Sequence, residues 1–135
     1  MSFTGNFTTN TFKQGLLNGD FDFAVDTIEI ALYTNAATLD ASTTAYTTVG
    51  EVVGTGYTAG GNTLTSTVSI VDGTAFVTFA NTSWSGAFTA RGALIYKDGG
   101  GAICVLDFGS DKTSSTVFQV QFPAATATSA LIRLS

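Results

Sequence analysis

At 135 residues, the chain is long enough for one domain with a buried core and too short for two. Its net charge of -5 and its five lysines and arginines exclude a basic surface that could neutralise a run of phosphates, so we expect no nucleic-acid partner. No segment approaches the roughly 18 consecutive apolar residues of a membrane helix, and a lone cysteine excludes an intrachain disulfide. We therefore expect one domain without a membrane partner, made in a reducing cytoplasm and stabilised by its core.

Hydroxyl groups supply most of the polarity of the chain. Charged residues make up only 11% of it, whereas 24 residues are threonine and 11 are serine. A surface built from hydroxyl groups repels copies of itself less than a charged surface does. This composition favours assembly into a dense protein lattice.

The chain is expected to begin with an extension that precedes the folded domain. Residues 1–10 form this amino-terminal extension, which orders on assembly with a neighbour, and residues 11–135 form the domain. Phe3 and Phe7, the two aromatic residues of the extension, are expected to contact another subunit or a shell.

A short helical turn is the first predicted element of the domain. Phe12, Leu16 and Leu17 lie at helical spacing, and Asn18-Gly19 is typical of a left-handed helix end. The threonine and asparagine residues around it have low helix propensity, which limits the helix to two or three turns.

Alternation of apolar and polar residues dominates the rest of the chain and predicts short strands. These strands cover residues 27–34, 64–71, 74–79, 87–97, 102–108, 116–122 and 130–134, with a weaker pattern at 51–57. In the first of them, Ile28, Ile30 and Leu32 share the face that should be buried, and the alternate residues face the other way.

Two turns and two longer loops connect these strands. Asp72-Gly73 is typical of a type I′ hairpin, and the glycines of 98–101 predict a second one. Residues 35–50 and 109–115 read as loops. The first loop, which carries Tyr46, is either an arm that contacts a partner or a crossover without a specific role.

Seven or eight short antiparallel strands need two sheets to bury their apolar faces, which predicts a single-domain, all-β sandwich. A jelly roll is the first choice of strand order, and an immunoglobulin-like sandwich is the alternative.

Catalytic chemistry has little support in the sequence. The chain has no histidine, which removes the commonest acid-base residue and zinc ligand. Cys104 lies in an apolar run, without a basic neighbour to activate it, and is expected to be buried and unreactive. The pairs Asp20 with Asp22 and Asp107 with Asp111 are weak candidates for glycoside hydrolysis. We expect no enzyme, no cofactor and no metal.

Two glycine-containing segments have alternative interpretations. The glycines at 54–56 and 60–61 superficially resemble a phosphate loop, but no lysine and no helix follow, so close turns are predicted instead. The acidic segment 19–23 with Asp26 contains oxygen ligands that Ca²⁺ prefers. It lacks the spacing of an EF-hand, which favours an ordinary acidic turn.

Trp84 and Arg91 are the remaining candidates for contacts. Trp84 either caps one end of the sandwich, which we favour, or forms a contact surface together with Tyr46 or Tyr57. Arg91 interrupts an apolar strand and needs an acidic partner if it is buried. It is either one half of an ion pair within the chain or an anchor between subunits.

Three segments carry a resemblance to a known group of proteins: 54–65 (GTGYTAGGNTLT), 88–96 (FTARGALIY) and 105–114 (VLDFGSDKTS). Their glycine and aromatic placement resembles that of small virion structural proteins of tailed bacteriophages, and the resemblance extends over residues 12–134. It implies that the protein belongs to a virus particle.

Within a particle, the small size and the lack of catalytic groups favour a capsid decoration or cement protein. Such a protein would be made in the bacterial cytoplasm and lie on the outer capsid surface, where it bridges copies of the major capsid protein and associates with itself as a homodimer or homotrimer. The alternative is a tail-associated or fibre-base module that binds carbohydrate on the host surface. A small glycosidase-like enzyme is the third and least supported hypothesis.

Overall fold

The protein folds as an all-β sandwich with one short helix, as the sequence predicts. A computed structural model describes residues 3, 5–123, 126 and 129–134. The elements of this part of the chain are β1 (Phe7–Thr8), α1 (Asn10–Asn18), β2 (Ile28–Tyr33), β3 (Asn62–Leu64), β4 (Ser66–Val71), β5 (Thr74–Phe79), β6 (Thr82–Ser85), β7 (Thr89–Lys97), β8 (Ala102–Thr113), β9 (Val117–Val120) and β10 (Ile132–Leu134).

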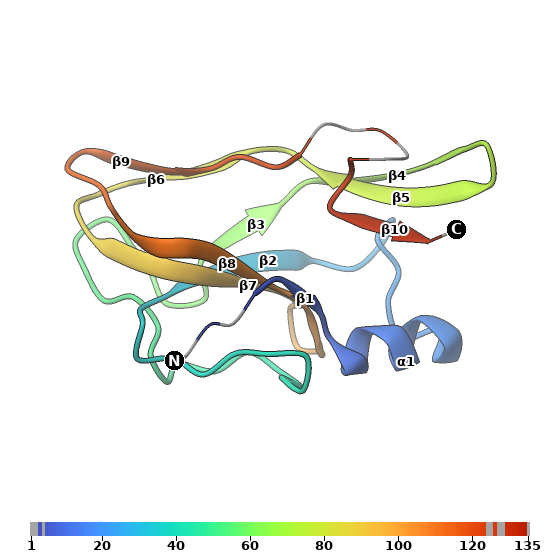
Figure 1. Cartoon of the computed structure of the whole chain (residues 1–135), viewed down its shortest axis with the longest axis horizontal. Helices are drawn as coiled ribbons and strands as arrows, with labels where there is room; N and C mark the ends of the chain where they lie inside the picture. Colours follow the sequence, from blue (N-terminus) through green and yellow to red (C-terminus); the bar gives the residue numbers. More distant parts are fainter. Residues whose placement is uncertain (1–2, 4, 124–125, 127–128, 135) are drawn as a thin grey trace.

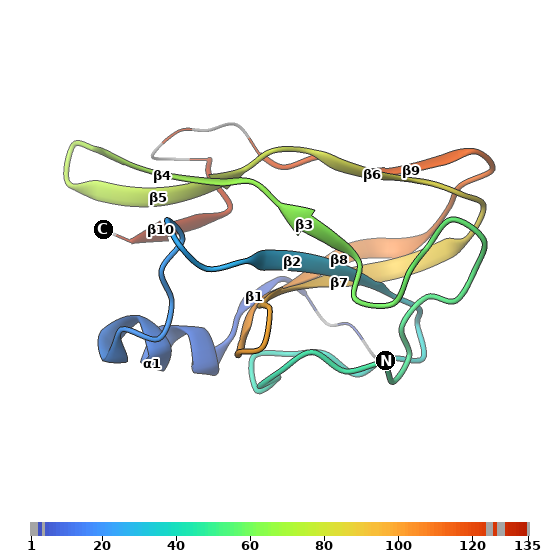
Figure 2. The same ribbon diagram turned by 180° about the vertical axis from the view of Figure 1, so that it is seen from behind.

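Two layers of antiparallel strands make up the sandwich (Figure 1). The first layer is one sheet of five strands in the order β1-β8-β7-β2-β3. The second layer consists of a three-stranded sheet, β10-β5-β4, and the pair β6-β9, which lie end to end. The β4–β5 hairpin extends beyond the end of the five-stranded sheet, on the side of the molecule where α1 lies (Figures 1 and 2).

The predicted strand 64–71 is two strands, because the chain passes from one layer to the other at Thr65. Asn62–Leu64 pairs with β2 in the first layer, and Ser66–Val71 pairs with β5 in the second. Periodicity continues through this point because both strands share the same alternation, so the sequence shows no break.

Both predicted hairpin turns are confirmed. Asp72 and Gly73 have φ values of 50° and 80°, as a type I′ turn requires, and they join β4 to β5. The segment 98–101 joins β7 to β8, with Gly99 at a φ of 74°.

Other boundaries differ from the prediction. The expected loop 109–115 is largely strand, because β8 continues to Thr113 after an irregularity that follows the Gly92↔Asp107 pair. The weak pattern at 51–57 forms no strand, and only a single bridge links Glu51 to Tyr33. The short strands β1 and β6 were not predicted, since two to four residues carry too little periodicity to be recognised.

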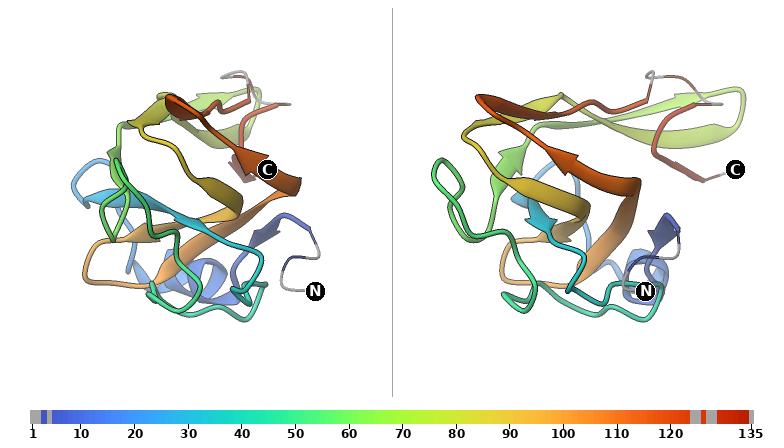
Figure 3. Two further views of the ribbon diagram at one scale, coloured as in Figure 1. Left: turned by 90° about the vertical axis from the view of Figure 1, so that its left-hand side faces the viewer. Right: turned by 60° about the vertical axis from the view of Figure 1, so that its left-hand side comes forward.

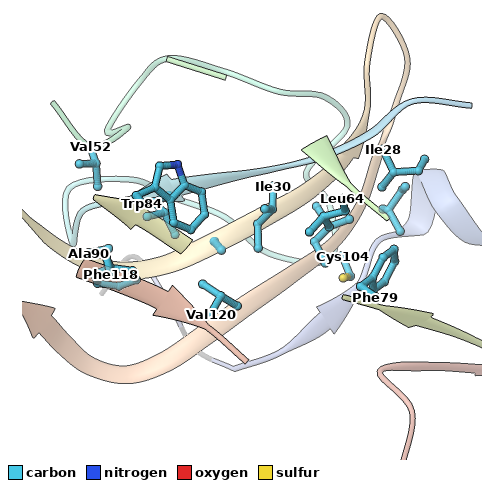
Figure 4. Packing of buried hydrophobic residues seen from close by; sticks show 14 of the residues in the cluster. Ile28, Ile30, Val52, Leu64, Phe79, Trp84, Ala90, Cys104, Phe118 and Val120 are labelled. Carbon is cyan, nitrogen blue, oxygen red and sulfur yellow. The ribbon is translucent and has the colours of Figure 1, made fainter. Parts of the chain in front are cut away.

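The main core lies between the two layers (Figure 4). Ile28, Ile30 and Leu32 are buried in it, which confirms the predicted register of β2, and rings from β5, β6 and β9 pack against them. A second core covers the opposite face of the same sheet, where Ala31 and Tyr33 are also buried. The loop 35–50 lies across that face (Figure 3), so β2 is buried on both sides rather than on one.

The described residues of segment 1–10 belong to the domain, in contrast to the expected extension; Met1, Ser2 and Thr4 lie outside the described residues. Phe3 is buried in the second core, and β1 pairs with β8. Thr9 is the N-cap of α1: its Oγ1 accepts a hydrogen bond from the Phe12 N–H at 3.1 Å and donates one to the Ala102 carbonyl at 2.8 Å. The helix ends at the predicted left-handed Gly19 after nine residues.

Candidate functional site

The six residues that the sequence suggested as contacts are mostly internal. Four of them are buried in this chain: Phe3 is 1% exposed, Trp84 4%, Arg91 7% and Tyr57 9%. Phe7 and Tyr46 are half-buried. The four buried side chains therefore hold the domain together and do not form an exposed contact surface.

Arg91 forms an ion pair within the chain, so its packing interpretation is confirmed for this structure. Its guanidinium contacts the carboxylate of Asp107 and lies 5.7 Å from the centre of the Phe3 ring. The Asp107 carboxylate also accepts the Gly109 N–H at 2.8 Å. Partial burial acts to raise the pKa of Asp107, but the Gly109 N–H and the Arg91 guanidinium together lower it below the ordinary value.

A second anchor joins this ion pair to the amino-terminal segment. The backbone N–H of Asp107 donates to Oδ1 of Asn6 at 2.6 Å, beside the Phe7–Val105 pair of β1 and β8. Arg91 thus lies beneath the amino-terminal segment, which covers it from solvent. Its ion pair with Asp107 helps to hold that segment against the five-stranded sheet.

Glu51 is the centre of a buried polar cluster that the sequence analysis missed. Its carboxylate accepts hydrogen bonds from the Tyr46 hydroxyl at 2.6 Å, the Tyr57 hydroxyl at 2.5 Å and the Gly60 N–H at 2.8 Å. The Tyr57 hydroxyl also accepts the Leu32 N–H at 3.0 Å. Three donors for one buried carboxylate offset the cost of removing it from water.

All four tyrosines of the chain belong to this tyrosine cluster, which we define as Tyr33, Tyr46, Tyr57 and Tyr96 around Glu51. The Tyr46 and Tyr96 rings stack with centroids 4.8 Å apart. Two of the hydroxyls donate hydrogen bonds to backbone carbonyls. The Tyr96 hydroxyl donates to the Gly60 carbonyl at 2.6 Å, and the Tyr33 hydroxyl donates to the Thr47 carbonyl at 2.7 Å. The cluster therefore fastens the segment 35–61 to the five-stranded sheet.

The tyrosines of the cluster are protonated at neutral pH. Burial, followed by the hydrogen bond to Glu51, raises the pKa of Tyr46 to about 12. Burial is also the main reason why the pKa of each of the other three is raised. Such hydroxyls act as hydrogen-bond donors and not as nucleophiles or bases, so the cluster has a structural role. A glutamate between Gly50 and Val52, near three tyrosines, was the only signal for it in the sequence.

Trp84 is a core residue at the β6–β9 end of the sandwich (Figure 4). Its ring lies against those of Tyr57 and Phe118, with centroids 6.0 and 6.4 Å away. The burial of Trp84 and Tyr57 contradicts a shared contact surface and agrees with the cap interpretation. Its indole N–H has no hydrogen-bond partner among the described residues.

The residues considered for chemistry occupy ordinary structural positions. Cys104 is buried, and burial raises the pKa of its thiol to about 12. Within the acidic turn, Asp22 Oδ1 accepts the Ala24 N–H at 2.9 Å, and Asp26 lies 3.3 Å from the Lys97 ammonium. The described part of the chain contains no group of three histidine, cysteine or acidic side chains that could hold a metal ion.

The glycine-rich segment is a close turn, as predicted. Gly56, Gly60 and Gly61 all have positive φ values, between 81° and 99°. A Cβ on Gly61 would lie 2.6 Å from the Ile30 carbonyl carbon, because the turn runs directly against β2. The residues after it form β3 rather than a helix, so no helix amino terminus is available for a phosphate.

The β4–β5 hairpin carries an apolar surface that is separate from the residues described above. Val68 on β4 lies opposite Val77 on β5, and Ile70 lies opposite Ala75, so these four side chains share the face toward α1. Val68 is 55% exposed and Ile70 is 71% exposed, whereas Val77 is buried at the edge of the main core. We call these four side chains, together with Leu134 of β10, the hairpin face.

The hairpin face borders an apolar groove of about 140 Å³ between the hairpin and α1. The side chains that line the groove are Phe12, Leu16, Phe23, Val68, Ala75, Phe76, Val77, Ile132 and Leu134. Among the described residues, no charged side chain lines this groove. Such a face on an isolated chain is typical of an association surface.

Charge is also sparse in the stretch of sequence that contains the hairpin. Between Glu51 and Arg91, the sequence contains a single charged residue, Asp72, which lies in the hairpin turn. This part of an acidic chain can therefore approach another acidic protein without strong repulsion.

Comparisons with models of protein families, with curated proteins and with solved structures find no match to this chain. No helix among the described residues has the length and apolar character needed to cross a membrane.

Proposed function

We propose that this chain is a structural protein of a tailed-bacteriophage virion, and that it decorates the outer surface of the capsid as a cement protein. The glycine and aromatic pattern of residues 54–65, 88–96 and 105–114 supports the virion setting. The hairpin face is the observation that carries the assembly role, because it exposes apolar side chains on an uncharged strand.

The remaining architecture supports a passive, adhesive role. The tyrosine cluster and the Arg91–Asp107 pair fasten the long loop and the amino-terminal segment to one sheet. A rigid domain loses little conformational entropy on attachment, and many weak contacts across a lattice give durable binding. The proposed partners are the major capsid protein and further copies of this chain.

A head-binding experiment tests the proposal. Purified protein is mixed with phage heads that lack it, and occupancy is measured by electron microscopy together with the temperature at which the heads rupture. We expect saturable binding at regular lattice positions and a higher rupture temperature. Absence of binding at any concentration contradicts the proposal.

The second candidate is a tail-associated module that binds host carbohydrate. A hollow of about 430 Å³ is lined by Tyr46 and Tyr96 together with Glu29 and Asp98, a combination of rings and carboxylates that suits sugar hydroxyls. Binding of the purified protein to host envelope polysaccharide, with loss of binding in Tyr46→Ala and no binding to heads, would favour this candidate.

A further inference from the structure

β4 is an open edge of the second layer. Among the described residues, in the order β10-β5-β4, it is bonded to β5 on one side only. Val71 and Thr74 flank the two-residue turn and so form a hydrogen-bonded pair. From there along the hairpin, non-hydrogen-bonded and hydrogen-bonded pairs alternate. The N–H and C=O groups of Ser66, Val68 and Ile70 therefore point away from β5, toward the outside of the sheet.

This edge lacks the features that normally prevent strand pairing. Natural edge strands carry lysine, proline, inward-facing charge or a bulge. β4 has the sequence STVSIV, with no charge and no proline, and it pairs with β5 without a break in register. Three of its six residues are β-branched and apolar, which favours further pairing.

We propose that β4 pairs antiparallel with β4 of a second copy, across a twofold axis at Val68. In this register Val68 faces the partner's Val68, and Ser66 faces the partner's Ile70. All outward backbone groups of both strands are then paired, and the two sheets become one. The inference names the partner of the hairpin face and rests on the proposed function only for its location on a head.

A second copy suits this edge better than an unrelated strand because the register is self-complementary. Val68 side chains from the two copies meet at the axis, so the two apolar hairpin faces join. On the other face, Thr67 lies opposite the partner's Ser69, where both side chains are hydroxylated and uncharged.

Electrostatic repulsion between the two acidic chains is small in this arrangement. Asp72, the nearest charge along the sequence, lies four residues from the axis in each copy. Eight residues of strand therefore separate the two carboxylates, which is about 27 Å at roughly 3.4 Å per residue. That separation exceeds the screening length of about 8 Å at physiological ionic strength.

A charge-complementation experiment tests the pairing. Val68→Lys and Val68→Glu are purified separately, and the mass of each in solution is measured by light scattering, alone and as an equimolar mixture. Because Val68 is 55% exposed, both variants should fold, which circular dichroism checks. Val53→Lys is the matched control, since Val53 is 94% exposed and lies far from β4 in sequence.

We expect the unmodified chain and the control to have twice the monomer mass, each Val68 variant alone to be monomeric, and the mixture to recover the dimer. A second measurement avoids any change of charge: Val68→Cys should cross-link with itself under oxidation, because facing residues in such a pair have Cα atoms about 5.5 Å apart. Val53→Cys should not.

A monomeric unmodified chain, a trimer, or a dimer that survives Val68→Lys overturns the inference. Head binding separates these outcomes from the proposed function. A chain that binds heads as a monomer leaves the cement role intact and removes the β4 pairing. A chain that dimerises through β4 but does not bind heads keeps the β4 pairing and removes the cement role.

Discussion

Replacing Gly61 by alanine should damage the fold far more than the same change at Gly73. Both glycines have nearly the same positive φ, 81° and 80°. A Cβ at position 73 meets no atom within 4 Å, whereas a Cβ at position 61 overlaps the Ile30 carbonyl of the central strand β2. Comparing the two substitutions therefore separates two costs. The left-handed backbone destabilises both variants, whereas the overlap with β2 destabilises only Gly61→Ala.

The magnitude follows from the geometry. Left-handed strain for alanine costs about 1 kcal/mol at either position. At position 61 the Cβ lies 2.6 Å from the Ile30 carbonyl carbon and closer still to the carbonyl oxygen, so β2 and the turn must separate by more than about 0.8 Å to reach an ordinary contact of 3.4 Å. Such a movement weakens the short β2–β3 pairing, which adds about 2–4 kcal/mol at roughly 1 kcal/mol per hydrogen bond.

Thermal unfolding followed by circular dichroism measures the difference. At roughly 3 °C per kcal/mol for a chain of this size, Gly73→Ala should lower Tm by about 3 °C and Gly61→Ala by about 9–15 °C. Guanidinium unfolding at 25 °C provides an independent free energy of unfolding. Equal effects of the two substitutions would refute the reasoning, because the close approach of the turn to β2 would then carry no cost.

Three further predictions concern the buried polar and thiol groups. Tyr57→Phe removes a donor to Glu51 and leaves the Leu32 N–H unpaired, so it should lower the free energy of unfolding by about 2–4 kcal/mol in denaturant titrations. The lowered pKa of Asp107 means that its stabilising contribution is present above its ordinary value of 3.8 and is lost as the pH falls through the lower folded value. The Tm difference between the unmodified chain and Asp107→Asn should therefore shrink on acidification below 3.8, and a constant difference contradicts this. Cys104 should react with a thiol reagent only after unfolding; rapid labelling of the native protein would show that the thiol is accessible.

Local signals explain why much of the fold could be predicted. The Asp72-Gly73 turn depends on two positive φ values that few residues tolerate. The inner face of β2 follows from the alternation that places Ile28, Ile30 and Leu32 on one side of the strand. Gly61 was recognised as a close turn because no helix followed it. Each of these inferences needs only a few consecutive residues.

Long-range contacts account for the errors. The amino-terminal segment folds back over the sheet, so that Phe3 is buried in the same core as Tyr33 and lies beside Arg91. Nothing near Phe3 in the sequence indicates this. Glu51 is satisfied by hydroxyls that lie five and six residues away, together with the Gly60 N–H, in a loop without regular structure. The tyrosine cluster exists only once the sheet and the loop have come together.

The hairpin face could be predicted only in part. The alternation of residues 66–71 is enough to place Val68 and Ile70 on one face of a strand, but periodicity gives the direction of a side chain and not what covers it. The hairpin extends beyond the five-stranded sheet, so these side chains face inward and yet remain exposed. Three-dimensional arrangement was needed to reveal β4 as the open edge.

The copy number of this chain in purified virus particles tests the central proposal most directly. Quantitative mass spectrometry of intact particles, calibrated on the major capsid protein, gives the ratio of the two chains. The cement role predicts a regular ratio to the capsid protein and on the order of hundreds of copies per particle, as binding throughout a symmetric shell requires. A few copies up to a few dozen, confined to the tail fraction after the particles are disrupted, would contradict it.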